Sequence, residues 1–225
     1  MKTKMNNKVK ALLMACCAVL LVFASVLGTL AYLTDTTEKV TNTFTVGKVD
    51  ISLDEAKVNK DGDLVNANGS VVSELDQAAR GNGNSEIRLV PANKVTKDPT
   101  ITVTSGSEKC WVRVKVVVTF DETDCDATTY EPEVANMFGT LGSGWSKVTD
   151  VVKNANQITY EYRYAYVVDD SSTIPAVFTE VTVPATWDND DLTAMGGMTI
   201  DITAHAIQAE GLADADAAWA AFPTP

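Results

Sequence analysis

Hydrophobic residues are arranged in two ways along this 225-residue chain: one unbroken run near the start, then alternation with polar residues. Lysines precede the apolar run at 11–27, and small residues follow it. A basic start, an apolar centre and a small-residue exit are typical of a secretory signal peptide. We therefore predict a helical signal peptide over 1–31, cleaved between Ala31 and Tyr32, and a secreted mature chain over 32–225.

The same segment allows two alternatives. The apolar run reaches the lower length limit of a membrane span, so an unprocessed segment would remain as an anchor. Leu13–Cys16 loosely matches a lipoprotein processing site, but it leaves only Ala11–Leu13 as an apolar core, which is too short to engage a membrane. Cleavage is the preferred interpretation, with membrane contact only through the signal peptide before cleavage.

Beyond residue 31, apolar and polar positions alternate, which predicts β-strands. Thr41–Val46 places Phe44 on an apolar face, and in Val49–Leu53 the parity flips, which predicts a bulge at Gly47–Lys48. Cys110–Phe120 is the strongest pattern and is expected at the centre of a sheet. Further strands are predicted at 101–103, 157–168, 178–183 and 198–209, and short helices at 131–141 and 212–222.

Strands joined by loops rather than helical crossovers predict an all-β fold, an antiparallel two-sheet sandwich of jelly-roll type with one or two short helices. Residues 56–85 are rich in turn signals and are predicted to form a long exposed excursion. Their aspartates and asparagines indicate ordinary turns in preference to a calcium loop. We identify no internal repeat in the sequence.

Charge and cysteine content narrow the function. The signal contains four of the 18 basic residues and none of the 30 acidic ones, so the mature net charge is −16. Such a chain repels nucleic acid, which excludes that class of partner. Cys110 and Cys125 remain after cleavage, and they either form a disulfide or stay as two unrelated thiols.

Few residues offer catalytic chemistry. The single histidine, His205, shares a strand face with Asp201 and Thr203, which predicts a solvent-facing position. No His-Glu-x-x-His zinc motif, nucleophile elbow or phosphate-binding glycine loop occurs in the sequence. We predict a protein that is not an enzyme, with no catalytic, cofactor-binding or metal-binding residues.

Two segments suggest binding. Four tyrosines alternate from Tyr160 to Tyr166, so their rings share one face, either a core face, which we prefer, or an exposed ladder for polysaccharide. Asp188–Asp191 is interpreted as a solvated loop in preference to a cation site.

Several blocks resemble those of TasA-like and camelysin-like exported proteins, whose signal peptide is processed by the SipW-type signal peptidase of Gram-positive bacteria. The similar blocks are Gly28–Asp35, Thr41–Gly47, Val49–Leu53, Lys97–Val103, Trp111–Val114, Ile202–Ala209 and Ala218–Trp219. The resemblance implies a jelly-roll sandwich at the cell surface, where members assemble into biofilm-matrix fibres. Relatives commonly have Pro-Gly where this chain has Pro91–Ala92, so that turn is expected to differ.

The segment before Phe44 is a candidate for the contact between copies. Residues 32–43 are Thr-rich, and we predict an extended arm that pairs with a sheet edge of a neighbour. The assembly residues are expected to be Thr34, Asp35, Thr41, Phe44 and Val46. Head-to-tail donation of this kind does not close, so it makes filaments.

The expected function is therefore that of a secreted structural protein that self-assembles, with its own copies, related matrix proteins and the signal peptidase as partners. The alternatives are a camelysin-like surface metallo-endopeptidase and a monomeric adhesion or glycan-binding module.

Overall fold

The computed structural model describes residues 6–33, 48–83, 87–120 and 126–222, with only the backbone of 22–33. The chain divides into two compact units, Met1–Thr45 and Val46–Pro225. In the first unit, the helix α1 (Asn7–Leu33) contains the apolar run of the predicted signal peptide. Among the described residues, no helix is both long and apolar enough to cross a membrane. The predicted assembly residues Thr34, Asp35, Thr41, Phe44 and Val46, and Gly47 of the predicted bulge, lie outside the described residues.

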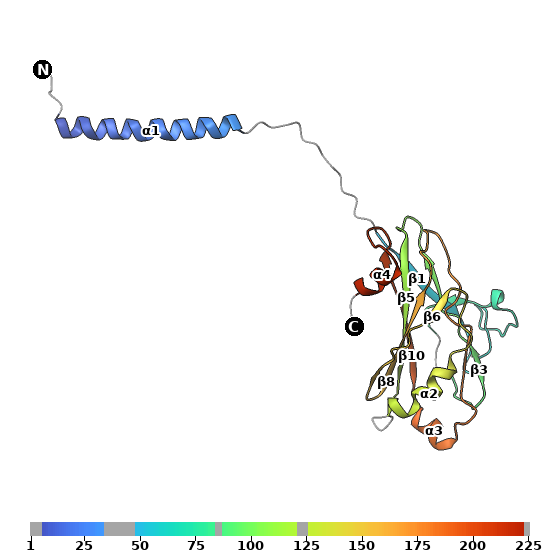
Figure 1. Ribbon diagram of the computed structural model, residues 1–225. Helices are drawn as coiled ribbons and strands as arrows, with labels where there is room; N and C mark the ends of the chain where they lie inside the picture. Colours follow the sequence, from blue (N-terminus) through green and yellow to red (C-terminus); the bar gives the residue numbers. More distant parts are fainter. Residues whose placement is uncertain (1–5, 34–47, 84–86, 121–125, 223–225) are drawn as a thin grey trace. The chain divides into compact units, whose positions relative to one another are not determined.

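The second unit is all-β, with antiparallel sheets and few helices, as predicted (Figure 1). One sheet has the order β2-β1-β4, a second has the order β10-β5-β8-β6 with β7 also on β8, and β3 pairs with β9. The strands are β1 (Ile51–Ala56), β2 (Arg80–Gly81), β3 (Lys94–Thr96), β4 (Thr100–Val103), β5 (Cys110–Thr119), β6 (Trp145–Lys147), β7 (Val152–Asn154), β8 (Gln157–Tyr164), β9 (Glu180–Thr182) and β10 (Thr199–Gln208). The helices are η1 (Leu75–Gln77), α2 (Ala127–Met137), α3 (Asn189–Ala194) and α4 (Ala215–Ala221).

The strand β5 is central, as its pattern predicts, because it pairs with β10 on one side and β8 on the other. Its even-numbered residues, from Cys110 to Val118, are all 0% exposed. They pack with Ile101 and Val103 of β4, so both larger sheets contribute to one core.

The odd-numbered face of β5 is not left to solvent, because helix α4 packs against it. Trp219 of α4 meets Trp111 edge to face at 5.8 Å, and the Phe222 ring lies 4.2 Å from the guanidinium of Arg113. Asp214 caps the helix by accepting from the Ala217 amide, which confirms the helix predicted at 212–222. Arg113 is consequently only 5% exposed.

Helix α2 begins earlier than the sequence predicts. Its N-cap is Asp126, which accepts from the Thr128 amide, and Pro132 lies inside the helix rather than at its start. Pro132 is the sixth residue of the helix, beyond the first turn, so it leaves the helix one N–H donor short at that position. The side-chain cap of Asp126 therefore sets the start, and Met137 ends the helix before Gly142.

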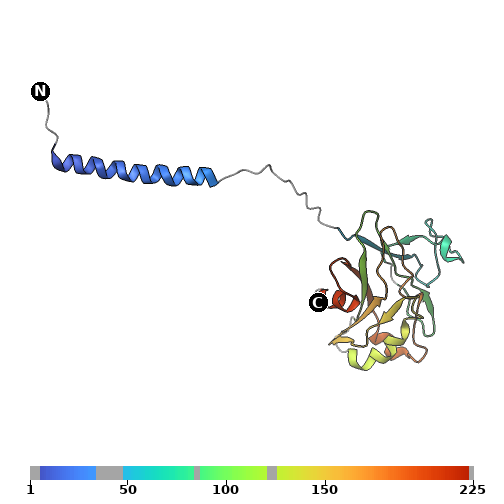
Figure 2. The same cartoon turned by 45° about the horizontal axis from the view of Figure 1, so that its top comes forward.

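The excursion after β1 contains a tandem repeat that we did not identify in the sequence. Asn59 Oδ1 accepts from the amides of Asp61 and Asp63, and seven residues later Asn66 Oδ1 accepts from those of Asn68 and Ser70. Each loop closes through an isolated bridge, Val58–Leu64 and then Val65–Val71. The excursion projects from the body in both views (Figure 1 and Figure 2).

The turn at Pro91–Ala92 has the left-handed conformation that glycine favours, although it has no glycine. Ala92 has a φ of 62°, and the Asn93 amide donates to the Val90 carbonyl at 2.9 Å. A positive φ at the third residue of such a turn normally selects glycine. The expected difference at this turn is therefore the residue itself: alanine, not glycine, has the positive φ.

Candidate functional site

The most unusual feature of the second unit is a long strand with one open side. In the described part of the chain, β10 pairs with β5 alone, over all ten of its residues. The backbone N–H and C=O groups of the even-numbered residues of β5 point toward β8, since the Cys110 amide donates to Val168 and the Phe120 amide donates to Asn156. The backbone groups of the odd-numbered residues of β5 therefore point toward β10. The even-numbered residues of β10 therefore turn their N–H and C=O groups away from β5. These residues are Ile200, Ile202, Ala204 and Ala206.

The strand β1 also has an open side over its first half. It pairs with β4 over Ile51–Asp54, but with β2 only at Glu55 and Ala56. The Asp50 carbonyl accepts from Thr104 beside β4, so the backbone groups of Ile51 and Leu53 point to the other side.

A groove lies between these two open edges, and we call it the edge groove. Its first half, about 630 Å³, is lined by Ile51–Glu55 of β1, Gly81–Gly83, Lys97 and Pro99, and residues 200–204 of β10. Its second half, about 590 Å³, shares Lys97, Ile200 and Asp201 with the first. The two halves are therefore continuous along β10.

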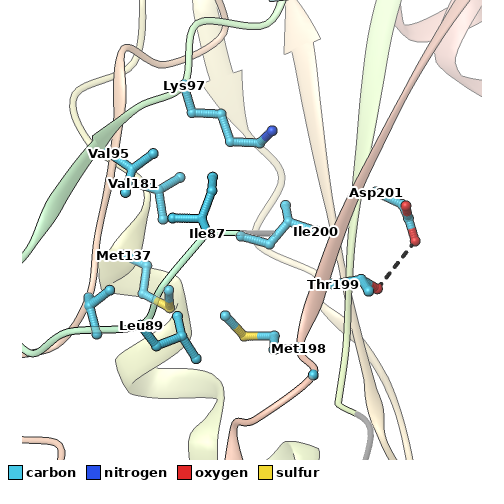
Figure 3. Close-up of a pocket in the computed structure, with 12 residues that line it drawn as sticks. Ile87, Leu89, Val95, Lys97, Met137, Val181, Met198, Thr199, Ile200 and Asp201 are labelled. Atoms are coloured by element: carbon cyan, nitrogen blue, oxygen red, sulfur yellow. Dashed lines mark hydrogen bonds between the residues drawn. The ribbon is translucent and has the colours of Figure 1, made fainter. Parts of the chain in front are cut away.

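The second half of the edge groove is mainly apolar (Figure 3). Its walls come from separate loops and strands: Ile87, Leu89, Val95, Met137, Val181 and Met198. The Lys97 side chain reaches over these apolar groups, whereas Asp201 and Thr199 lie on the other side of the strand (Figure 3). Ile87, Leu89, Met198 and Ile200 are only partly buried, so the groove exposes core-type side chains.

A buried ion pair stands at the midpoint of the edge groove. Lys97 Nζ lies 2.6 Å from Glu55 Oε2, and the two side chains are 12% and 6% exposed. Burying a charge is costly, and the loss of either residue would leave the other charge buried without a counter-ion. The pair joins the end of β1 to the segment before β4.

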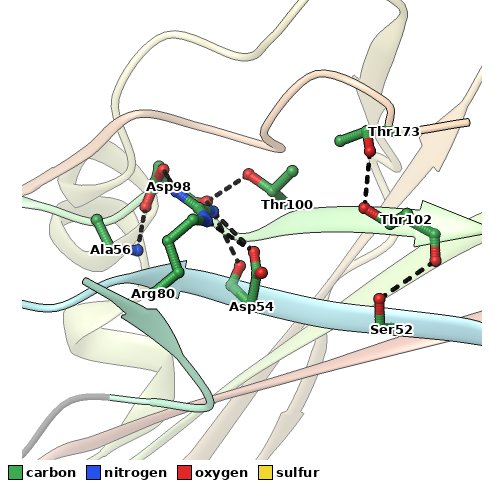
Figure 4. Close-up of polar contacts among 8 residues, drawn as sticks. All are labelled: Ser52, Asp54, Ala56, Arg80, Asp98, Thr100, Thr102 and Thr173. Atoms are coloured by element: carbon green, nitrogen blue, oxygen red, sulfur yellow. Dashed lines mark hydrogen bonds and ion pairs between the residues drawn. The ribbon is translucent and has the colours of Figure 1, made fainter. Parts of the chain in front are cut away.

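The neighbouring Asp98, just before β4, contacts the end of β1 and Arg80 of β2 (Figure 4). It accepts from the Ala56 amide at 2.7 Å, and its second oxygen lies 2.7 Å from an Arg80 nitrogen. Arg80 also contacts Asp54 at 2.8 Å. Burial lowers the pKa of Arg80, but its contacts with the Asp54 and Asp98 carboxylates raise that pKa by more, so the net shift is upward. The wall of the groove formed by β1 is thus held by charged contacts to β2 and to the start of β4.

The histidine lies on the predicted face of β10, opposite the groove-facing residues. His205 pairs with Arg113 across the strands and is partly buried, and its Nδ1 has no hydrogen-bond partner among the described residues. Burial lowers its pKa below 6.5, and Arg113 and Lys115 lower it further, while Glu161 opposes them. The predicted full solvent exposure is therefore wrong, because the face beside it carries α4 and these long side chains.

Of the two cysteines considered for a disulfide, the structure describes only Cys110. Cys110 is a buried free thiol whose pKa burial raises to about 11, and Cys125 lies outside the described residues.

The tyrosine row is mostly core. Tyr160 and Tyr162 are 0% and 1% exposed, and burial raises the pKa of both phenols. Tyr164 packs on Trp145 at the rim, and Tyr166 lies beyond the end of β8 with 63% exposure. The preferred core interpretation is confirmed, and a ladder of four exposed rings is not formed.

Asp188–Asp191 forms the N-terminus of α3 rather than a loop. The Asp188 side chain accepts from the amides of Asp190 and Asp191, in a reciprocal capping box. In the described ranges, no group of three or more His, Cys, Asp or Glu side chains is arranged to hold a metal ion.

Ala31 and Tyr32 lie in the last turn of α1. Sequence reasoning did not identify the residues that form the edge groove, above all Glu55, Lys97 and Ile202. The Lys97–Asp98–Pro99 block stands out only through the family resemblance, and its spacing gives no indication of an ion pair 42 residues away.

Comparison with known proteins adds no further constraint: no family model, no curated protein and no solved structure matches this chain.

Proposed function

We propose that this chain is a secreted structural protein of a Gram-positive cell surface or biofilm matrix, related to TasA-like and camelysin-like proteins. Its copies join head to tail by donating the N-terminal arm, residues 32–43, together with the assembly residues Phe44 and Val46, to the edge groove of the next copy. The second unit is a jelly-roll sandwich whose two sheets would be bridged by the donated strand. SipW-type processing after Ala31 releases the protein and frees the arm.

The observation that carries this proposal is the pair of open strand edges facing one groove. An added strand would gain main-chain hydrogen bonds from β10, and its alternate side chains would cover Ile51, Leu53, Ile200 and Ile202. Long, uncharged strand edges are normally blocked in monomeric proteins because they pair with other chains.

The sequence supports the arm as the occupant. Residues 40–46 (VTNTFTV) alternate apolar or amide side chains with threonines, which is the pattern of a strand with one covered face. The arm adjoins β1, so each copy would carry both a donor and an acceptor, and head-to-tail contacts of this kind propagate.

The test compares purified mature protein, residues 32–225, with a deletion of residues 32–43. We expect filaments by electron microscopy for the first and only monomers for the second, with the same far-ultraviolet circular dichroism. A deletion variant that still forms normal filaments would refute strand donation, and a mature protein that stays monomeric would refute the structural role. Chelator-sensitive cleavage of casein by the mature protein would favour the peptidase alternative instead.

A further inference from the structure

We infer that Asn82 is a site of spontaneous deamidation, at which its side chain reacts with the following backbone amide and is converted into aspartate and isoaspartate. The co-reactant is water. The inference does not depend on strand donation, because it concerns a covalent change within one chain. It bears on the edge groove all the same, since Asn82 lines the first half of that groove.

The sequence contains two Asn-Gly pairs, Asn68–Gly69 and Asn82–Gly83. Glycine after asparagine favours this reaction because glycine has no side chain to hinder the approach of its amide nitrogen to the asparagine side chain. All four residues are exposed, so water reaches both pairs. Both glycines have the same left-handed backbone, with φ of 79° and 77°, and a Cβ added to either would meet no other part of the chain within 4 Å. The two pairs are therefore matched in residue type, exposure and local conformation.

The two pairs differ in how the glycine amide is held. The Gly69 amide donates to the Asn66 carbonyl at 2.9 Å, and the Asn68 amide donates to Asn66 Oδ1 at 3.0 Å. The Gly83 amide, by contrast, donates to no acceptor within the described ranges. The Lys57 ammonium contacts the Gly83 carbonyl, but this contact does not engage the amide nitrogen.

The hydrogen bond matters because the amide nitrogen is the nucleophile. It must lose its proton and turn toward the side chain, and an amide that is hydrogen-bonded within a turn does both only after local opening. At Asn82, the Gly83 nitrogen attacks Cγ and forms the N–Cγ bond. The Cγ–Nδ2 bond then breaks, ammonia leaves with the amide proton, and a five-membered succinimide ring remains.

Water opens this ring, and no oxidant or reductant is needed. Attack at the side-chain carbonyl breaks the new N–Cγ bond and gives aspartate. Attack at the main-chain carbonyl breaks the original peptide bond and gives isoaspartate, in which the backbone passes through the side chain and is one carbon longer. Both products replace a neutral amide with a carboxylate.

The surroundings of Asn82 show what this change affects. Position 82 directly follows Gly81, which pairs with Glu55 at the end of β1. The Lys57 stem lies against Gly81, where an added Cβ would meet its Cε at 2.8 Å, and the Lys57 ammonium contacts the Gly83 carbonyl. The new carboxylate therefore forms beside a cation at the rim of the edge groove. Deamidation marks older copies of the protein by a groove of altered charge.

Incubation of the purified full chain at mildly alkaline pH, followed by peptide mapping with mass spectrometry, tests the inference. In water labelled with heavy oxygen, we expect label in aspartate and isoaspartate at position 82. These products should form about fivefold faster than those at position 68, the factor expected from the net contribution of one hydrogen bond. In urea, the two pairs should react at nearly equal rates, because neither amide is then held.

Two variants provide matched controls. Asn66→Ala removes the side-chain acceptor of the second turn, so it should speed the reaction at Asn68 and leave the rate at Asn82 unchanged. Asn82→Gln should abolish the reaction at position 82 and keep the circular dichroism spectrum, because a longer side chain cannot form the five-membered ring.

The outcomes separate this inference from the proposed function. Equal rates at the two pairs in the folded protein, or a faster reaction at Asn68, overturn the inference, as does the absence of labelled product at position 82. A mature protein that stays monomeric refutes the proposed function and leaves the difference between the two Asn-Gly pairs unchanged.

Discussion

The two edges of the sheet containing β5 are built differently. On one side, β8 is covered by β6 and β7, each three residues long, and their outer positions include Lys147 and Lys153. On the other side, β10 presents ten residues with isoleucines and alanines toward the edge groove. Short, charged edge strands discourage pairing with other chains, whereas a long apolar one invites it. The comparison teaches that one edge is protected and the other is suited to receive a strand.

The largest expected effect breaks the open edge. Ile202→Pro removes an N–H that faces the groove and places a ring in the path of the incoming strand, while no hydrogen bond to β5 is lost. We expect filaments to disappear in electron micrographs and the monomer to keep its circular dichroism spectrum.

The matched control lies on the protected edge. Lys153→Pro in β7 also removes an outward-facing N–H, at an exposed position. Filaments should form as in the unchanged protein. Equal loss of filaments from both variants would contradict the difference between the two edges.

The next effect concerns the wall of the groove formed by β1. Lys97→Met removes the counter-ion of the buried Glu55 carboxylate, and we expect a loss of about 3–5 kcal/mol in the free energy of unfolding by urea. The double variant Lys97→Met with Glu55→Leu should recover most of this loss, because neither charge is then buried.

An exposed pair provides the comparison. Lys94 and Glu180 lie 2.8 Å apart at 65% and 37% exposure, so Lys94→Met should cost less than about 1 kcal/mol. Equal costs for the two lysine variants would show that the Lys97–Glu55 pair does not hold the groove wall.

The smallest effect is on the face of β10 away from the core. The His205 pKa is lowered in the folded protein, first by burial and then by Arg113 and Lys115. As the pH falls below about 6.5, the unfolded chain binds the proton first, so stability is lost between the unfolded and the folded pKa. Urea midpoints at pH 7.5 and 5.5 should differ less for His205→Gln than for the unchanged protein. Thr203→Ala should keep the original difference, and an unchanged difference in His205→Gln would exclude the histidine as its source.

Strand patterns in the sequence predicted much of the fold. The even-numbered residues of β5 and the tyrosines of β8 alternate so regularly that periodicity alone assigns their inward face. Alternation succeeds there because the odd-numbered positions, apart from Val117, carry polar or bulky residues. Boundaries were less predictable: Pro132 indicated a helix start, but the Asp126 side chain caps the helix one turn earlier.

The candidate site could not be predicted in the same way. Ile200 and Ile202 read as ordinary inward-facing residues, and only strand order shows that nothing described pairs with their outer edge. Glu55 and Lys97 are 42 residues apart and meet only when β1 and β4 pair. Helix α4 was predicted, but its position over Arg113 was not.

The sequence by itself determined the local properties of this protein: the basic and apolar start of α1, the period-two strands, the acidic composition after residue 31 and the alternation of residues 40–46. These depend on neighbours along the chain, where side-chain periodicity and charge act directly. The tertiary structure alone decided which edge is open, how the ion pair divides the groove and which face is covered by α4. Those features arise from contacts between distant segments, and strand pairing fixes them only when the sheets assemble.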